Sequence, residues 1–241
     1  MLLLHLVADP SGDSLGVLNW FAVHGTSMNN TNTLTSGDNK GYASYMLERT
    51  INGPTVTTGK GSFVAAFAST NLGDTSPNTN GAKCIDTGLP CDGTTSTCNG
   101  KCENCIAFGP GTNGDMFEST QIIGDKQFQF ALGLMKDSVG AAGSAVEGPI
   151  DYRYSFVKMS SLNVTLQDGT VKTLCSPAMG YSFAAGTTDG PGMFNFSQGA
   201  TTSNPFWNKV RDFLSQPTPD EIACQRPKPI LLNTGESLSA L

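Results

Sequence analysis

LGVLNWFAVH, residues 15–24, is a short apolar run rich in β-forming residues that ends on a histidine. Its length and composition predict a buried strand. The run LLHLV, residues 3–7, precedes it, and the turn-forming ADPSGDS lies between the two, so together they predict a β-hairpin. The loop that follows stays polar and nearly uncharged to about Asp38. His24 therefore stands at a strand end, where a side chain can face a cleft.

Apolar patterns further along the chain predict a mixed α/β fold. GYASYMLER, residues 41–49, has a helical pattern, and Ser62–Ala68 predicts a second buried strand that opens into a turn-rich loop. We expect this strand to lie beside the first one. Asp115 and Glu118 form a capping-box pattern that begins the most regular helical segment. The chain has no internal repeat and no linker that divides it.

The sequence of the last third of the chain predicts a hairpin, a helix and a strand. Asp168-Gly169 between two alternating runs predicts a two-residue hairpin turn. Pro205 in NPFWNKVRDFL suits the first turn of a short helix. The apolar part of KPILLNTGE, residues 228–236, predicts a final strand.

Composition excludes several classes of function. Among 241 residues only 14% are charged, and the net charge is −6. The basic residues are scattered, which excludes the basic footprint of a nucleic-acid-binding protein. No apolar run approaches the roughly 18 residues of a membrane-spanning helix, although a role at a membrane surface stays open.

The cysteines indicate an oxidising compartment. Five of the seven lie between Cys84 and Cys105, in a loop of glycine and small polar residues that has no core of its own. Disulfides usually order such loops in secreted proteins. Three sequons begin at Asn29, Asn163 and Asn195 and agree with this interpretation. We therefore expect an extracellular or cell-surface protein, although the first ten residues read as a strand and not as a signal peptide.

The segment CNGKCENC offers a different hypothesis. Cys98, Cys102 and Cys105 have the spacing of a radical SAM iron–sulfur motif, and a structural zinc loop is a milder variant of the same idea. Both require a reduced compartment, which the rest of the composition does not favour.

Two side chains are candidates for chemistry. The chain has only two histidines, His5 inside a strand pattern and His24 at a strand end. Ser76 lies between Gly73 and Pro77, in a tight loop that exposes its hydroxyl. From the residues alone, a structural histidine and an ordinary Ser-Pro turn remain open.

Five blocks together resemble the neutral ceramidase family, in the order and at the spacing found there. The similarity covers nearly the whole chain, and the blocks read NWFAVHGTSMNNTNTLTSGDNKGYASYMLE, FVAAFASTNLGDTSPN, CIAFGPG, GYSFAAGTTDGPG and KPILLNTGE. The resemblance implies a layered α/β/β/α zinc amidohydrolase domain with a disulfide-stapled loop. It also implies hydrolysis of the amide bond of ceramide and other N-acylsphingosines at a membrane surface, which releases sphingosine and a fatty acid.

The resemblance assigns roles to particular residues. His24 matches a histidine ligand of one zinc ion, and Ser76 matches the catalytic serine. The serine could attack the carbonyl carbon, or it could hydrogen-bond the tetrahedral intermediate. The matching positions also imply three disulfides and leave Cys102 as an extra residue. These pairs are Cys84–Cys98, Cys91–Cys105 and Cys175–Cys224.

The chain departs from the family in its ligand set. The resemblance puts a second histidine ligand upstream of residue 1, and a glutamate ligand, a tyrosine ligand and an immunoglobulin-like domain downstream of residue 241. Residues 1–241 therefore read as part of a catalytic domain, and one ligand does not hold a catalytic zinc ion. Two alternatives are a non-catalytic lipid-binding fragment and a disulfide-stapled extracellular interaction module.

Overall fold

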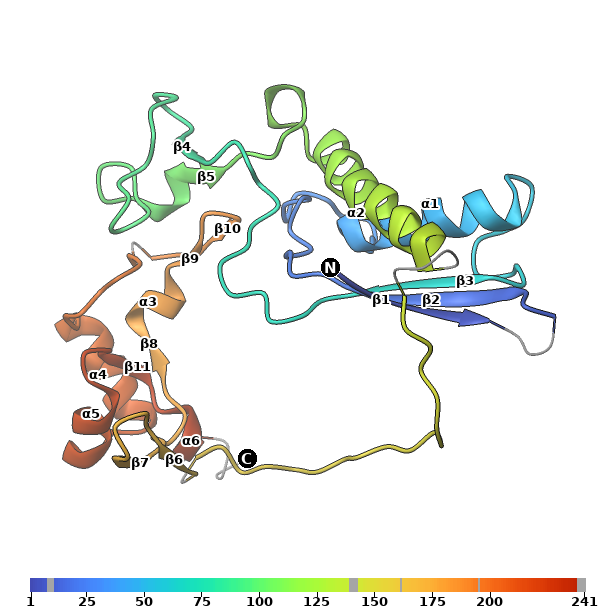
Figure 1. The fold of residues 1–241 in the computed structure, drawn as a ribbon. Coiled ribbons are helices and arrows are strands. Elements are labelled where there is room, and N and C mark those ends of the chain that lie inside the picture. Colours follow the sequence, from blue (N-terminus) through green and yellow to red (C-terminus); the bar gives the residue numbers. More distant parts are fainter. Residues whose placement is uncertain (8–10, 139–142, 161, 195, 238–241) are drawn as a thin grey trace. The chain divides into compact units, whose positions relative to one another are not determined.

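The computed structural model describes residues 1–7, 11–138, 143–160, 162–194 and 196–237. The chain forms two compact units (Figure 1). Unit 1 comprises Met1–Gly81 and Ala107–Gly148, and unit 2 comprises Ala82–Ile106 and Pro149–Leu241. No pattern in the sequence marks this division.

Unit 1 is built on a three-stranded sheet of order β1-β2-β3. The hairpin prediction is confirmed, because β1 (Leu2–Val7) pairs antiparallel with β2 (Ser14–Trp20). The second predicted strand is β3 (Val64–Ala68), which pairs with β2 in parallel. The predicted end of the first strand is wrong, because β2 ends at Trp20, the last residue in register with β3, and His24 lies in the loop beyond.

Helices α1 (Asp38–Asn52) and α2 (Met116–Ser138) pack on one face of this sheet (Figure 1). The opposite face of β2 is open, and Leu18 there is 37% exposed, so the strand is buried on one side only. Each large apolar side chain buried in this core stabilises the fold by about 1.5–3 kcal/mol. The buried members are Val17, Ala43, Leu47, Phe63, Ala65, Phe128 and Met135.

The two helices approach each other closely at Gly124 of α2. A Cβ atom at this position would lie 2.8 Å from the backbone oxygen of Asn39 in α1. Only glycine permits that separation, because any side chain would collide with backbone atoms. The contact brings the first turn of α1 against α2.

The predicted cap of α2 is half confirmed. The Asp115 side chain accepts a hydrogen bond from the backbone N–H of Glu118 at 2.7 Å, as an N-cap residue does. The reciprocal bond of a capping box is missing, because the Glu118 carboxylate accepts from the N–H of Thr112 instead. The turn of residues 112–114 before the helix brings this competing donor into reach.

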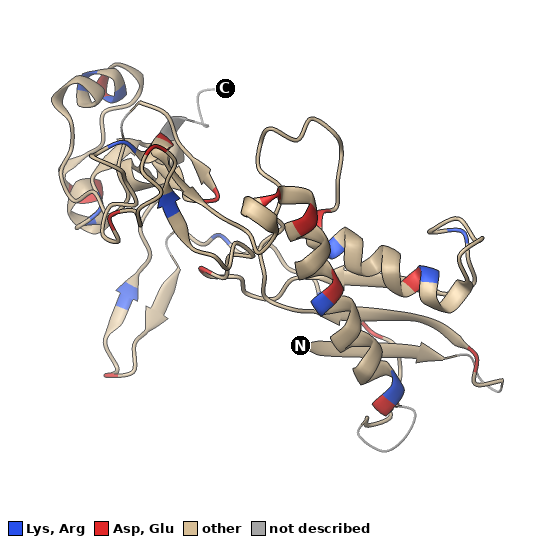
Figure 2. Cartoon of the chain, turned by 90° about the horizontal axis from the view of Figure 1, so that it is seen from above, with Lys and Arg blue, Asp and Glu red and all other residues tan. Residues whose placement is uncertain are grey.

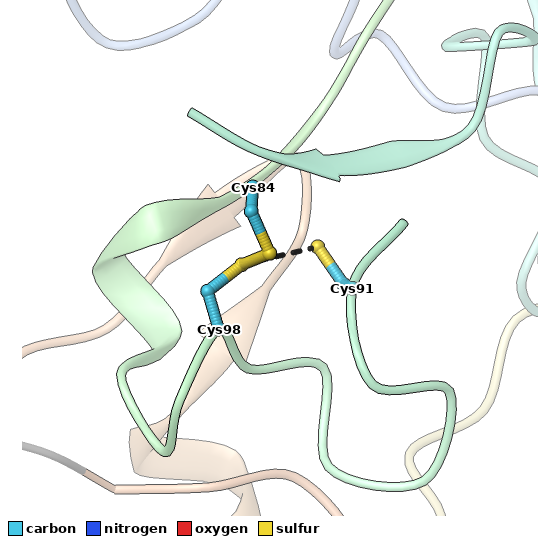
Figure 3. Close-up of side chains that lie close together, drawn as sticks. All are labelled: Cys84, Cys91 and Cys98. Atoms are coloured by element: carbon cyan, nitrogen blue, oxygen red, sulfur yellow. Dashed lines mark hydrogen bonds between the residues drawn. A yellow bond between two sulfur atoms is a disulfide. The ribbon is translucent and has the colours of Figure 1, made fainter. Parts of the chain in front are cut away.

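Unit 2 contains the cysteine-rich loop, in which β4 (Ala82–Cys84) and β5 (Cys105–Ala107) form a small sheet. All three predicted disulfides are present, and Cys102 is a buried free thiol. The iron–sulfur and zinc-loop hypotheses are wrong, because Cys98 and Cys105 are each bonded to another cysteine. Figure 3 shows the Cys84–Cys98 bridge with Cys91 beside it, at 3.8 Å between the sulfurs of Cys91 and Cys98.

The predicted hairpin near Asp168 exists with a longer turn. Strands β6 (Asn163–Thr165) and β7 (Val171–Thr173) pair antiparallel. The Leu166 N–H donates to the carbonyl of Thr170, which leaves a three-residue loop closed by a glycine at φ +81°. The two-residue prediction is therefore wrong, since the glycine adopts the left-handed position that ends a three-residue turn.

The rest of unit 2 is a set of short elements around a small core of Tyr181, Ala185 and Phe196. The predicted helix is α4 (Pro205–Leu214), which Asn204 caps, and the predicted last strand is β11 (Ile230–Leu232). The remaining elements of unit 2 are β8 (Met179–Gly180), α3 (Tyr181–Ala184), β9 (Gly186–Thr187), β10 (Gly190–Pro191), α5 (Pro219–Gln225), α6 (Thr234–Ser237) and the turn Cys102–Asn104. The turn Thr112–Gly114 belongs to unit 1.

Charged residues are dispersed over the elements of both units (Figure 2). Helix α2, for example, carries both acidic residues (Glu118, Asp125 and Asp137) and basic residues (Lys126 and Lys136). Among the described residues no helix has the length and apolar character needed to cross a membrane. Of the three sequon asparagines, Asn29 and Asn163 are exposed, and Asn195 lies outside the described residues.

Candidate functional site

Both candidate residues follow the carboxyl ends of two neighbouring parallel strands. Because β2 and β3 run in parallel, their carboxyl ends meet at one edge of the sheet, and the loops that carry His24 and Ser76 both begin there. The backbone extends this pairing by one further bond, from the N–H of Phe21 to the carbonyl of Ala68 at 3.1 Å. The prediction that the two strands are neighbours is confirmed.

Lys40 of α1 binds this edge of the sheet. Its Nζ donates to the carbonyl of Phe21 at 2.6 Å and to the carbonyl of Ala68 at 3.3 Å, and it also lies 5.5 Å from the centre of the Phe21 ring. Partial burial lowers the pKa of Lys40 to about 8, because the protein replaces part of the water around the ammonium group. The lysine therefore joins the two strand ends that lead into the candidate site.

The two loops are hydrogen-bonded to each other beyond the strand ends. The N–H of His24 donates to the carbonyl of Thr75 at 3.1 Å, and the side-chain amide of Asn78 donates to the carbonyl of Thr26 at 3.2 Å. His24 thus lies beside the residue that precedes Ser76. Whether both side chains open on one cleft remains a prediction.

The imidazole of His24 is held by a backbone oxygen. Its Nε2 lies 3.0 Å from the carbonyl oxygen of Gly73, in the loop of Ser76. A carbonyl only accepts, so this bond requires a proton on Nε2 and leaves the Nδ1 lone pair as the ligand or base when the ring is neutral. A second partner that fixes one tautomer in this way is typical of histidines that bind metals.

Ser76 is held by its own turn. Its Oγ accepts a hydrogen bond from the N–H of Asn78 at 3.0 Å, the side-chain-to-backbone pattern of a serine turn. Gly73 begins the loop at φ +54°, in the left-handed region that glycine adopts most easily. The buried ring of Pro77 restricts the next position. The serine oxygen is therefore oriented by local backbone geometry.

A cavity of about 420 Å³ lies beside Ser76. Ser76 is part of its wall, whereas His24 is not among the described residues that line it. Most of the wall is apolar, so the cavity suits a hydrocarbon group better than a charged one. The apolar lining comes from Met1, Phe21, Val23, Pro77, Ile123 and Phe130.

The described residues do not assemble a catalytic metal site. One group of three potential ligands lies close together, namely Cys84, Cys91 and Cys98 within 4.8 Å, and disulfides engage all three sulfurs. His24 offers a single nitrogen, and a catalytic zinc ion normally takes three protein ligands. The residues present therefore do not fit a zinc ion by themselves.

Sequence reasoning missed the polar residues behind the His24 loop. Asp38, Asn39 and Gln127 are all buried, at 8%, 0% and 3% exposure. The segment GDNKG, residues 37–41, reads from the sequence only as a poor match to a phosphate loop. An Asp-Asn pair at a helix start is the one signal that could have indicated a role in fixing the adjacent loop.

Residues 1–240 match a family model described as neutral/alkaline non-lysosomal ceramidase, N-terminal. The chain is 56% identical over 95% of its length to Neutral ceramidase B of Dictyostelium discoideum, and 50% identical over 95% to Neutral ceramidase of Drosophila melanogaster. It spans only 32% and 33% of these relatives, which is about a third of their length.

Two solved structures are also similar. One, described as ceramidase complexed with C2, has a TM-score of 0.64 and 34% identity over 98% of this chain and 31% of its own. The other, neutral ceramidase from Pseudomonas aeruginosa, has a TM-score of 0.58 and 30% identity over 97% of this chain and 29% of its own.

Proposed function

The chain belongs to the neutral/alkaline non-lysosomal ceramidase family, and from this premise we propose that it contributes to hydrolysis of the amide bond of N-acylsphingosines. The products are sphingosine and a free fatty acid. The proposed whole is a layered α/β/β/α zinc amidohydrolase domain, of which residues 1–241 form a part. One observation carries the proposal: Ser76 lies in the wall of an apolar cavity, directly after the residue that binds the His24 backbone.

The substrate class agrees with the chemistry of this cavity. An N-acylsphingosine carries two hydrocarbon chains around one amide, so its binding requires an apolar wall with a few polar groups near the reacting carbon. The Ser76 hydroxyl is one of the polar groups on this wall, which also includes Thr75, Thr79, Lys126 and Gln127. It can attack the carbonyl carbon or stabilise the oxygen of the tetrahedral intermediate, and both roles are open.

The proposal assigns one zinc ligand to this chain, the Nδ1 of His24. Zinc at such a site would polarise the amide carbonyl and acidify a bound water molecule. We propose that the other ligands come from the part of the relatives that this chain does not span, because His24 alone is too few. The isolated chain should accordingly bind zinc weakly and turn over little ceramide.

A chimera tests the proposal directly. Residues 1–241 would replace the matching third of Neutral ceramidase B of Dictyostelium discoideum, to which they are 56% identical. We expect the chimera to bind zinc and hydrolyse a fluorescent ceramide, and the isolated chain to do neither. A folded chimera that binds zinc but leaves ceramide intact would refute the assignment of the reaction.

A lipid-binding fragment without catalysis is the second candidate. It is favoured by the combination of an apolar cavity with a single potential zinc ligand. Binding of a non-hydrolysable ceramide analogue to the isolated chain, lost when Phe130 in the cavity wall is changed to Asp, would support it. A plain extracellular interaction module would need no cavity beside Ser76.

The proposed location is extracellular or at the cell surface. Three disulfides in one chain are typical of an oxidising compartment. Glycosylation at Asn29 or Asn163 would agree with this location, since both side chains are exposed. Mass spectrometry of protein from a secreting eukaryotic host measures it.

A further inference from the structure

The first turn of α1 carries a buried amide that contacts the His24 loop. Asn39 is fully buried, and its Nδ2 lies 2.9 Å from the carbonyl oxygen of His24 and 3.0 Å from the Oγ of Ser27. The preceding Asp38 accepts from the backbone N–H groups of Ser27 at 3.1 Å and Met28 at 2.8 Å. Two adjacent side chains therefore hold the loop backbone. Asn39 binds the carbonyl group of His24, and Asp38 binds the N–H groups of Ser27 and Met28.

A second amide from α2 sets the orientation of the first. The Nε2 of Gln127 donates to the Oδ1 of Asn39 at 3.0 Å, so Asn39 must direct its own N–H groups away from Gln127 and towards the His24 loop. The same Nδ2 also lies 2.8 Å from the Oδ1 of Asp38. Gln127 also lines the cavity beside Ser76, and its Oε1 is buried without a partner in the described part of the chain. The two amides thus form a directed chain of hydrogen bonds from the cavity wall to the His24 carbonyl.

The His24 loop buries few of its own side chains. Residues 25–31 are glycine, methionine and small polar residues, and among residues 24–28 only Ser27 is buried. Without apolar packing, the position of the loop depends on its hydrogen bonds, and buried bonds of this kind are costly to leave unmade. The contact of the His24 ring with Gly73 depends in turn on the position of the His24 backbone.

We propose that Asn39 is a positioning residue for His24, oriented by Gln127. It holds the His24 carbonyl, and thereby keeps the ring donating from Nε2 to Gly73 with Nδ1 open. The inference rests on the proposed function only in the role given to Nδ1. The hydrogen-bond relay itself is independent of any reaction.

Helix α1 offers a matched control at its other end. Asn52 also bonds the backbone through its amide, donating to the carbonyl of Phe63 at 2.8 Å and accepting its N–H at 3.1 Å. These bonds reach the residue before β3, at the opposite edge of the sheet from His24. Asn52→Ala therefore removes a similar amide from the same helix without touching the candidate site.

The test uses nuclear magnetic resonance of the full 241-residue chain. Long-range nitrogen–proton spectra report the tautomer of each histidine, and hydrogen exchange reports the His24 amide that is bonded to Thr75. His5, whose Nε2 lies 2.9 Å from the Oγ of Ser14, is the internal reference. In Asn39→Ala we expect exchange at the His24 amide to be at least about fivefold faster. We also expect a mixture of His24 tautomers in place of the Nε2–H form.

The control separates positioning from general loss of stability. Asn52→Ala should leave the exchange rate and tautomer of His24 unchanged. Unchanged signals in Asn39→Ala, or equal changes in Asn52→Ala, would overturn the proposal. If Asn39→Ala does not fold, Gln127→Met decides, because it removes the bond that orients Asn39 and, besides that bond, the 3.3 Å bond from Gln127 to the carbonyl of Ile123 within the same helix. A shift of the His24 signals in the same direction supports the proposal, and no shift overturns it. No turnover is measured, so the outcome is independent of the ceramidase assignment.

Discussion

The backbone N–H of His24 and the carbonyl of Thr75 are joined by a 3.1 Å hydrogen bond, so the two candidate loops share one backbone contact. Parallel pairing of β2 and β3 makes this possible, because it delivers both chains to the same edge of the sheet. A shift of either loop therefore moves the backbone on both sides of the proposed site. Substitutions in one loop should therefore change the backbone position of the other.

His24 and Ser76 should separate metal binding from turnover. In the chimera described above, His24→Ala should lose both zinc and activity, because it removes a ligand. Ser76→Ala should keep zinc and lose about 100-fold or more in kcat, as loss of a transition-state hydrogen-bond donor does. Metal analysis by mass spectrometry and a fluorescent-ceramide assay measure both. Full zinc and full activity in His24→Ala would mean that this histidine is structural.

The Cys175–Cys224 disulfide should contribute most to the stability of unit 2. It closes a loop with a sequence separation of 49, whereas the other two bridges each span 14. Loop entropy then predicts that the double variant Cys175→Ser with Cys224→Ser lowers the free energy of unfolding by about 4 kcal/mol. Denaturant titration of unit 2 fluorescence, from Trp207, measures the change. A loss below about 1 kcal/mol would show that the loop stays ordered without its bridge.

Cys102 should be unreactive in the folded chain. Burial, and next the charge of Glu103, raise the pKa of the thiol, which is 3% exposed. Alkylation needs an accessible thiolate, so iodoacetamide should modify the folded chain at least about 100-fold more slowly than the unfolded chain. Mass mapping of the unfolded chain without reduction should then find one labelled cysteine, Cys102. Three labelled thiols at Cys98, Cys102 and Cys105 would restore the cluster hypothesis.

Lys40 should make stability depend on alkaline pH. Desolvation lowers its pKa from 10.5 to about 8 in the folded chain, so between these values the unfolded chain holds a proton that the folded chain has released. Unfolding then takes up a proton, and stability rises with pH through this window. The difference in unfolding free energy between the natural chain and Lys40→Met should increase from pH 8 to 10. Urea titrations at several pH values measure it, and a flat difference would show that the two carbonyl contacts keep the lysine charged.

Much of the fold follows from local patterns. The hairpin β1–β2, the helix at residues 41–49 and the strand before Ser76 have periodic or punctuated sequences, and each occurs in the structure. Two local predictions fail, because the backbone forms other hydrogen bonds than the sequence pattern predicts. Glu118 bonds Thr112 in place of its own cap, and the turn at Asp168 gains a residue. Neither of these hydrogen-bonding differences alters the hydrophobic pattern of the sequence, so the pattern does not reveal them.

The sequence by itself determined the family, because five blocks carry the resemblance in residue identity and spacing, and that resemblance implied the three disulfide pairs and the roles of the two candidate residues. Only the tertiary structure decided that the His24 ring binds the carbonyl of Gly73 through Nε2, which leaves the Nδ1 lone pair available. It also decided that Ser76 lines the apolar cavity. Asn39 and Gln127 are 88 positions apart, and their bond depends on the packing of two helices. A hydrogen bond between distant residues has no periodicity along the chain, so no local pattern predicts it.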